Sequence, residues 1–127
     1  MTREAISTTS APAAVGPYSQ AIVAGDLVFC AGQIPLDPAT GEVTASTIED
    51  QTERVLRNLG AVLDAAGVTF ADVVKTTVFM ADLGEFSAMN GVYARFFPDP
   101  PPARSTFGVA ALPRGAKIEI ECIARRR

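Results

Sequence analysis

Residues 46–66 carry the clearest periodic pattern of the chain. Apolar residues recur there at intervals of three and four positions, which is typical of a helix with one buried face. Ser46 and Glu49 have the spacing of a capping box at the start of this stretch, and Gly67 provides a stop signal at its end. The pattern predicts an amphipathic helix whose apolar stripe packs in a core.

A second helical pattern follows the cap-like sequence at residues 82–85. Apolar and aromatic side chains continue it from Phe86 to Phe97. Pro98 ends it, because proline has no amide hydrogen to donate, and the proline-rich residues 98–102 are predicted to be extended. We therefore predict a second amphipathic helix before this proline run.

Most of the remaining chain has the composition and alternation of β-strands. The predicted strands cover residues 5–8, 19–24, 27–34 and 73–80, a stretch that begins near Arg104, and residues 117–122. Gly25 and Asp26 form a tight turn between the second and third of these strands. The third strand is an almost continuous apolar run, which predicts burial on both of its faces.

Polar and apolar residues alternate strictly in the last strand. Ile118, Ile120 and Cys122 fall on one face, while Glu119 and Glu121 fall on the other. A period of two is the signature of a strand with one dry face and one polar face. The polar face carries chemistry only if it lines a cleft.

The turn sequence Leu-Pro-Arg-Gly at residues 112–115 predicts a hairpin between the last two strands. In such a hairpin Glu119 lies opposite residues 107–109. Arg104 is then about 10 Å further along at the usual strand rise. Contact of both residues with one substrate requires a bend, a long reach or a neighbouring subunit.

Six strands and two helices in the order βββαβαββ predict a single domain over residues 1–127. Helices that each carry one apolar stripe must lie on one face of a sheet, which gives a two-layer α+β sandwich with a mixed sheet. The strands offer apolar residues in both parities, for example Phe107 and Ile118. The opposite sheet face therefore exposes some of them, and self-association is the natural way to cover it.

Composition narrows the class of protein. Of the 127 residues, 48% are hydrophobic and 20% are charged, and the net charge is −3. These values favour a folded domain and argue against a nucleic-acid-binding surface. The chain has no apolar run near the ~20 residues of a membrane span and no secretory signal. We therefore expect a cytoplasmic protein without a membrane or nucleic-acid partner.

The chain contains no histidine and only two cysteines, Cys30 and Cys122. This removes the usual Ser-His-Asp and Cys-His nucleophilic systems. It also leaves no zinc ligand set, so no metal is expected. Acid–base chemistry then falls to carboxylates, a lysine, water, Tyr18 or Tyr93.

Arg104 and Glu119 are the first candidates for chemistry. Arg104 follows a stiff proline run, and a guanidinium can hold a carboxylate through two parallel hydrogen bonds. Glu119 can position and deprotonate water, or pass a proton between two substrate atoms. The alternative for each is ordinary: a surface or salt-bridged arginine and an exposed glutamate of the sheet.

Tyr18 and Gly32 are the next candidates. A tyrosine after the rigid Gly16-Pro17 turn can form a pocket wall with its ring and offer a hydroxyl. Gly32 follows a buried strand and lets a backbone amide approach a ligand closely. Neither belongs to a phosphate-binding loop, because the sequence has no P-loop and no dinucleotide-binding glycine motif.

Together these features resemble the RidA (YjgF-type) enamine/imine deaminases, from about residue 5 to residue 126. The motifs that carry the resemblance are Gly16-Pro17-Tyr18-Ser19-Gln20, Ala31-Gly32-Gln33-Ile34-Pro35, Lys75-Thr76-Thr77-Val78-Phe79, Asn90 with Tyr93-Ala94-Arg95-Phe96-Phe97, Pro102-Ala103-Arg104-Ser105 and Lys117-Ile118-Glu119-Ile120-Glu121. Each motif alone is weak, but the ordered set is specific.

The resemblance implies a chorismate-mutase-like fold and a homotrimer with sites between subunits. It implies hydrolysis of enamine and imine acids, such as 2-aminoacrylate or 2-iminobutyrate, to 2-keto acids and ammonia, without a cofactor. By position, Arg104 would bind the substrate carboxylate and Glu119 would handle the attacking water. Tyr18, Gly32 and Asn90 would line or support the pocket.

Two pocket positions depart from the family pattern. Ala31 stands where many members have serine, and Thr106 stands where many have cysteine. These differences bear on substrate range and rate more than on the reaction, because Arg104 and Glu119 are both retained.

Three other functions stay open from the sequence. One is a trimer that binds keto acids or amino acids without turnover, as a regulator. Another is an RNA-directed activity, which the acidic balance and the lack of histidine disfavour. The third is a purely structural trimer, which gives no reason for Arg104 to follow a rigid proline run.

Overall fold

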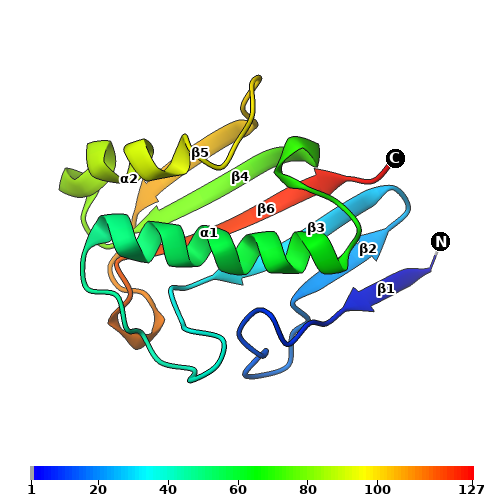
Figure 1. Ribbon diagram of the computed structural model, residues 1–127, viewed down its shortest axis with the longest axis horizontal. Coiled ribbons are helices and arrows are strands. Elements are labelled where there is room, and N and C mark those ends of the chain that lie inside the picture. The colour runs from blue at the N-terminus through cyan, green and yellow to red at the C-terminus, as the bar shows by residue number, and fades with distance from the viewer. Residues whose placement is uncertain (1) are drawn as a thin grey trace.

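The computed structural model describes residues 2–127 and shows one sheet with two helices on one of its faces (Figure 1). The helices are α1 (Ile48–Ala65) and α2 (Phe86–Tyr93), and the strands are β1 (Arg3–Ile6), β2 (Ala21–Ala24), β3 (Leu27–Gln33), β4 (Val73–Met80), β5 (Ala103–Gly108) and β6 (Ile118–Arg125). The predicted α+β class, the element order and the placement of both helices on one face are confirmed.

The last strand of the chain lies inside the sheet, whose order is β1-β2-β3-β6-β4-β5. Neighbouring strands run antiparallel except β4 and β5, which are parallel. The predicted hairpin between the last two strands is therefore wrong, because β4 separates β5 from β6. α2 supplies the crossover that a parallel pair needs. The dry side of β6, with Ile118 and Ile120 completely buried, suits a central position.

α1 forms where its apolar stripe predicts it. Leu56 and Leu59, which belong to this stripe, are completely buried. The N-cap is Thr47, whose hydroxyl accepts a hydrogen bond from the Asp50 amide at 3.1 Å. The cap thus lies one residue later than Ser46, the cap that the sequence predicts.

α2 is shorter than its aromatic pattern predicts. Asp82 caps a short 3-10 turn, and the regular helix ends at Tyr93. Phe96 and Phe97 lie beyond that end and pack edge-on against Phe70, with ring centroids 5.6 and 5.2 Å away. These aromatic residues belong to the core, but tertiary packing rather than helical periodicity places them.

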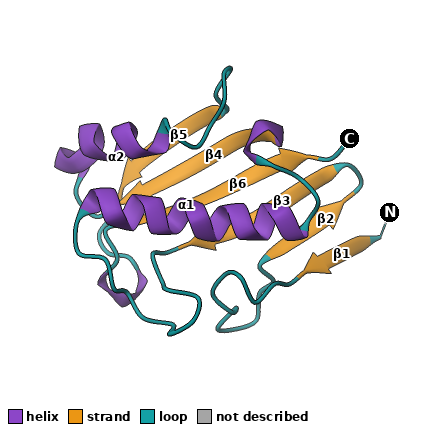
Figure 2. Cartoon of the chain, viewed as in Figure 1, coloured by secondary structure: helices purple, strands orange, loops and turns teal. Residues whose placement is uncertain are grey.

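Figure 2 shows both helices on the same side of the sheet, and we call the other side the open face. On β3, Val28 is buried, but Phe29 is 43% exposed. The prediction that this strand is buried on both faces is therefore wrong for the single chain. Phe79 and Phe107 stack on the open face with ring centroids 6.4 Å apart. The sheet thus has the partly apolar second face that the strand parities predict.

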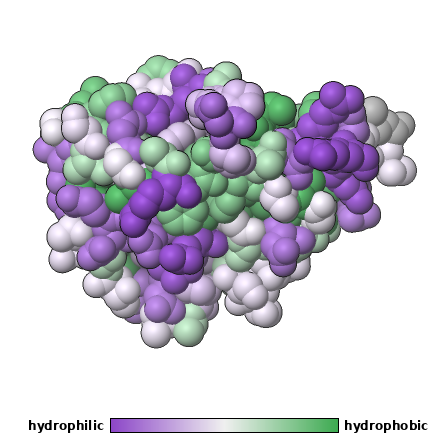
Figure 3. Space-filling model, turned by 45° about the horizontal axis from the view of Figure 1, so that its top comes forward, coloured by the Kyte–Doolittle hydropathy of each residue, from purple (hydrophilic) through white to green (hydrophobic). Residues whose placement is uncertain are grey.

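Hydrophilic residues are spread in separate groups over the surface seen in Figure 3, with apolar residues between them. In that view the hydrophilic residues do not join into one continuous stripe of the kind that follows a nucleic-acid backbone. No helix in the described part of the chain is long and apolar enough to cross a membrane.

Candidate functional site

Two separate cavities contain most of the residues that the sequence singles out. The Glu119 pocket, of about 470 Å³, is lined by Tyr18, Ala31, Gly32 and Glu119 and by apolar residues that include Val15, Leu36 and Pro113. The Arg104 pocket, of about 630 Å³, is lined by Arg104, Asn90, Tyr93, Phe97, Pro101 and Pro102, among others.

Glu119 lies on the central strand β6 and points to the open face, since its neighbours Ile118 and Ile120 are buried on the helix side. Its carboxylate is half-buried and forms none of the ion pairs found among residues 2–127. Burial raises the pKa of Glu119, and the nearby charge of Glu121 raises it further. A carboxylate with a raised pKa and no bound cation is suited to exchange a proton with water or substrate.

Gly32 leaves the space that this carboxylate occupies. A Cβ atom added at Gly32 would overlap Glu119 Oε2 and lie 2.9 Å from the Glu119 carboxyl carbon. The group that approaches Gly32 in the single chain is thus the Glu119 side chain. Approach of a ligand to the Gly32 backbone stays a prediction.

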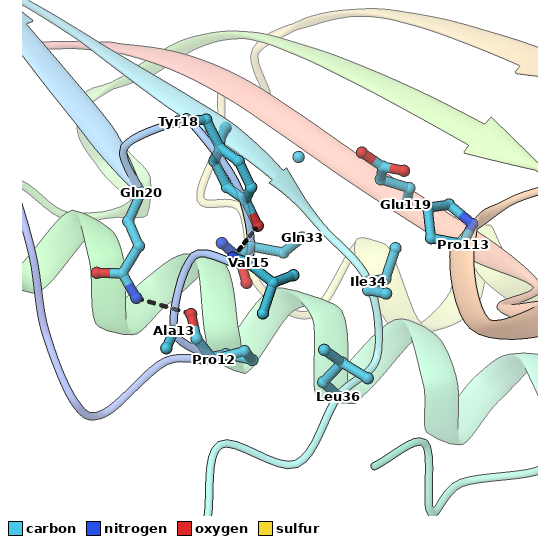
Figure 4. A pocket seen from close by; sticks show the side chains of 12 residues that line it. Pro12, Ala13, Val15, Tyr18, Gln20, Gln33, Ile34, Leu36, Pro113 and Glu119 are labelled. Carbon is cyan, nitrogen blue, oxygen red and sulfur yellow. Dashed lines mark hydrogen bonds between the residues drawn. The ribbon is translucent and has the colours of Figure 1, made fainter. Parts of the chain in front are cut away.

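Tyr18 forms another wall of the Glu119 pocket. The turn before it needs a glycine, because Gly16 has a φ of 134°. The Tyr18 hydroxyl accepts a hydrogen bond from the Val15 amide at 3.3 Å, although half of the residue is exposed. Figure 4 shows Tyr18 and Glu119 on opposite sides of the end of β3, so the pocket lies between an aromatic ring and a carboxylate.

Buried amide side chains hold the loops of the Glu119 pocket, and sequence reasoning missed them. Gln20 donates a hydrogen bond to the Pro12 carbonyl at 2.8 Å (Figure 4). Asn58 of α1 donates to the carbonyls of Ile34 and Leu36 at 3.2 and 2.9 Å. Asn58 lies on the apolar stripe of α1 and is completely buried. A polar amide among the apolar positions of a helix is the sequence signal that could have identified Asn58.

Arg104 lies on the edge strand β5 and points to the helix side of the sheet. It pairs with Thr76 of β4, which is completely buried on that side. The Arg104 guanidinium carbon lies 4.8 Å from the ring centroid of Tyr93 and 5.4 Å from that of Phe86. Two aromatic rings of α2 therefore stabilise the guanidinium charge through cation–π contacts. Arg104 takes part in none of the ion pairs formed within residues 2–127, which leaves its donors available to an anion.

Tyr93 is fixed in turn by the sheet beneath it. Its hydroxyl lies 2.7 Å from the Thr76 hydroxyl in a buried hydrogen bond. Burial raises the pKa of Tyr93, against the opposing effects of this hydrogen bond and of Arg104. The sequence marks Tyr93 only as an acid–base candidate, whereas the structure shows it as a support for the Arg104 guanidinium.

Asn90 and Thr106 accompany Arg104. Asn90 lines the Arg104 pocket from α2, and Thr106 pairs with the buried Val78, which puts it on the same side of β5 as Arg104. The structure therefore divides the predicted site residues into two groups, one with Tyr18, Ala31, Gly32 and Glu119 and the other with Asn90, Arg104 and Thr106.

The two groups cannot meet on one small substrate within a single chain. Arg104 and Cys122 both pair with Thr76, and Glu119 precedes Cys122 by three residues. With a strand rise of ~3.3 Å and a strand spacing of ~4.8 Å, the Cα atoms of Arg104 and Glu119 are about 14 Å apart. Their side chains also point to opposite faces of the sheet.

The cysteines give no sign of metal or nucleophilic chemistry. Residues 2–127 hold no group of three or more His, Cys, Asp or Glu side chains that could bind a metal ion. Cys30 and Cys122 are register partners and are both buried. Contact with Cys30 and burial raise the pKa of the Cys122 thiol, which disfavours the thiolate that reacts with metals and electrophiles.

Known proteins resemble the whole chain. A protein from Arabidopsis thaliana, named Reactive Intermediate Deaminase A, chloroplastic, is 57% identical over 96% of this chain, which spans 65% of that protein's length. A Mus musculus protein, named 2-iminobutanoate/2-iminopropanoate deaminase, is 47% identical over 96% of this chain and 90% of its own. The crystal structure of the YjgF gene product from E. coli has a TM-score of 0.93 at 46% identity, with 98% of this chain and 99% of that chain covered.

A family model gives the same assignment. The model described as Endoribonuclease L-PSP matches residues 8–126, which include every residue assigned above to either pocket. The chain therefore belongs to the Endoribonuclease L-PSP family, which is the YjgF/RidA family that its sequence motifs resemble.

Proposed function

We propose that this chain is a hydrolytic deaminase that converts reactive enamine and imine acids, such as 2-aminoacrylate or 2-iminobutyrate, to 2-keto acids and ammonia. The names of the Arabidopsis and mouse relatives, at 57% and 47% identity over most of the chain, support this activity. The observation that carries the proposal is the presence of two charged side chains that face cavities and have no ion-pair partner among residues 2–127. The Arg104 guanidinium and the Glu119 carboxylate each face a cavity, and neither belongs to an ion pair of the described residues.

The reaction needs few groups because an imine carbon is already electrophilic. Arg104 binds the substrate carboxylate through paired hydrogen bonds and so orients the imine carbon. Glu119 accepts a proton from water as the water oxygen bonds to that carbon. That proton passes to nitrogen and gives a carbinolamine. The hydroxyl proton of the carbinolamine then passes through Glu119 to the amino group, the carbon–nitrogen bond breaks, and ammonia leaves as the keto group forms. An enamine enters the same sequence after it gains a proton at its terminal carbon.

We also propose a homotrimer whose sites lie between subunits. The separation of Arg104 from Glu119 by about 14 Å supports this arrangement, because one imino acid spans only a fraction of that length. A neighbour that covers the open face can bring its β5 edge, and with it Arg104, close to Glu119. Phe29 and Phe107, which are 43% and 52% exposed, supply the apolar surface that such a contact buries.

The two departures from the family pattern lie where they can affect substrate range. Ala31 lines the Glu119 pocket, and Thr106 shares a strand face with Arg104. We propose that they adjust which imine acids react fastest. The proposed reaction uses no metal and no cofactor, and the proposed compartment is the cytoplasm, although the Arabidopsis relative is named as chloroplastic.

A binding protein without turnover is the second candidate. Arg104 would hold a keto acid or amino acid in the same way, so the Arg104 pocket fits both functions. The half-buried Glu119 carboxylate favours catalysis, since a pure carboxylate receptor has no use for a second anion near its ligand. RNA cleavage, which the family description names, is not proposed, because the chain has a net charge of −3 and no histidine.

A coupled assay tests the proposal. A pyridoxal-phosphate enzyme generates 2-aminoacrylate and 2-iminobutyrate in situ, and keto-acid release is followed with the wild type, with Arg104→Ala and with Arg95→Ala. Arg95 is an exposed arginine that pairs with Glu53 outside both pockets, so it serves as the matched control. We expect faster release with the wild type and the control only. A folded wild type that binds keto acids without accelerating release would favour the binding protein.

A further inference from the structure

We propose that Gly32 is a positioning residue for Glu119, because the side chain missing at position 32 leaves the space in which the Glu119 carboxylate is held. The contact belongs to the fold of the single chain. Only its kinetic consequence rests on the proposed function.

A bulge brings the two residues together. Cys30 pairs with Cys122, whereas Gln33 pairs with Ile120, so three steps along β3 match two steps along β6. An extra residue in one strand bends it and redirects the neighbouring side chains. Here the bulge brings the Gly32 backbone beneath the end of the Glu119 side chain.

The available space is smaller than a methyl group. A Cβ atom at Gly32 would overlap Glu119 Oε2, and it would lie 2.9 Å from the carboxyl carbon and 3.0 Å from Cγ. The nearest obstructing atoms therefore all belong to one flexible side chain. Gly32 is also not among the glycines with positive φ, so alanine can adopt its backbone conformation without strain. The expected consequence of Gly32→Ala is a displaced carboxylate in an intact fold.

No ion pair among residues 2–127 fixes that carboxylate. The space left at Gly32 is thus the feature that we infer sets its position across the pocket from Tyr18. A displaced carboxylate leaves its half-buried place beside Gly32 and no longer meets the water that attacks the imine.

The test compares Gly32→Ala with Gly108→Ala. Gly108 is a matched control, because it is also a strand glycine and its added Cβ would meet the end of a flexible side chain, Leu83, at 3.0 Å. We expect Gly32→Ala to lower kcat by about 10- to 100-fold with little change in KM, as for a misplaced catalytic group. Gly108→Ala should keep wild-type kinetics, and both variants should keep the wild-type Tm and oligomeric state.

A double variant separates positioning from ligand approach. Glu119→Ala removes every side-chain atom that lies over Gly32. If Gly32 acts through Glu119, Gly32→Ala should change the residual rate of Glu119→Ala by less than about twofold, because the two effects are coupled. If Gly32 instead admits a ligand to its backbone, the added methyl should lower the Glu119→Ala rate as much as it lowers the wild-type rate, and that result overturns the proposal.

A measurement without turnover covers the case in which the proposed function fails. The Glu119 carboxyl carbon can be followed by NMR with labelled glutamate and assigned with Glu119→Gln. Because burial raises the pKa of Glu119, a carboxylate displaced towards solvent should show a lower pKa in Gly32→Ala than in the wild type. An inactive wild type with this shift contradicts the deaminase but supports the positioning. An unchanged pKa, or an unchanged kcat in an active enzyme, overturns the positioning itself.

Discussion

Glu119 and Arg104 are held in place in different ways. Glu119 stands on the central strand β6, and the backbone of Gly32 defines the space for its carboxylate. Arg104 stands on the edge strand β5, where the rings of Tyr93 and Phe86 hold its guanidinium. One group is therefore positioned by close backbone packing, and the other by aromatic side chains of a neighbouring helix.

The difference follows from the place of each strand in the sheet. A strand inside the sheet is paired on both sides, so its backbone is fixed. The absence of a side chain at Gly32 can therefore define closely where the Glu119 carboxylate lies. An edge strand leaves one side unpaired, so its side chains need support from α2 but stay accessible to another molecule. Arg104, at the edge of the sheet, is thus accessible to a neighbouring subunit. Glu119, at the centre of the sheet, depends on a neighbouring subunit to approach it.

The largest effect is expected from a charge on the open face. Phe107→Asp places a carboxylate on a surface that we propose to be covered by another subunit, while Phe107 is exposed enough in the single chain for the fold to survive. We expect a folded monomer without measurable imine hydrolysis, checked by light scattering and circular dichroism. Leu83→Asp, at a similarly exposed residue on the helix side next to Gly108, is the control and should stay trimeric. A fully active monomer would show that one chain unites both groups.

The next largest effect is recovery of activity from two inactive variants. Arg104→Ala and Glu119→Gln each lose one group, but a mixed trimer contains some interfaces at which an intact Arg104 meets an intact Glu119. With equal co-expression, about a quarter of the sites are complete if each site takes one group from each of two subunits. We expect roughly that fraction of the wild-type rate.

The control for this recovery is a mixture of Arg104→Ala with the double variant that lacks both groups. No subunit of that mixture supplies Arg104, so no rate above background is expected. If the two single variants also give no recovery despite confirmed mixed trimers, both groups must act from the same subunit. The separation seen in one chain would then have to close by a conformational change.

A smaller effect is expected in the pH dependence of the rate. Glu119 must be ionised to accept a proton, and burial and the charge of Glu121 raise its pKa. The rate should therefore fall on acidification at a pH above the ordinary glutamate range. Glu121→Gln removes the lesser of the two causes, so the acid limb should move slightly to lower pH. Glu4→Gln, at an exposed position on β1, should leave the limb unchanged.

The same pKa shift has a consequence for stability. A group whose pKa is raised in the folded state contributes stability that is present at low pH and is lost as the pH rises through the folded pKa. At pH 7 the ionised Glu119 therefore opposes folding. Glu119→Gln should keep or slightly raise the Tm there, with a difference that shrinks as the pH falls. A lower Tm for Glu119→Gln at pH 7 would mean that the carboxylate has a stabilising partner.

The sequence was sufficient for the elements but not for their neighbours in the sheet. The apolar stripe that includes Leu56 and Leu59, and the alternation around Ile118 and Ile120, predict a helix and a strand because each pattern is local. No local pattern tells whether β6 pairs with β5 or with β4, since both arrangements bury the same side chains. A hairpin between β5 and β6 was the simpler prediction. In the structure the crossover through α2 pairs β5 with β4 instead.

The site shows the same limit. Motif spacing brings out Arg104 and Glu119, but it cannot show that they face opposite sides of the sheet, since facing depends on strand order and register. The aromatic support of Arg104 was missed for a similar reason. Phe86 is separated from Arg104 by 18 residues, and only the crossover geometry places its ring near the guanidinium. Gly32 was singled out for a close approach, but its partner became visible only with the bulge in β3.

The smallest expected effects come from the aromatic support of Arg104, and they test whether its guanidinium is held by side chains at all. Phe86→Leu removes one ring, and an exposed cation–π contact of ~0.5–1 kcal/mol predicts a KM about two- to fivefold higher with little change in kcat. Tyr93→Phe keeps its ring but leaves the buried Thr76 hydroxyl without its partner, which should cost ~1–3 kcal/mol of unfolding free energy. Urea unfolding and steady-state kinetics measure both. If Phe86→Leu leaves KM unchanged, the guanidinium must be aimed by the backbone after the proline run, and Arg104 and Glu119 would then be held in the same way after all.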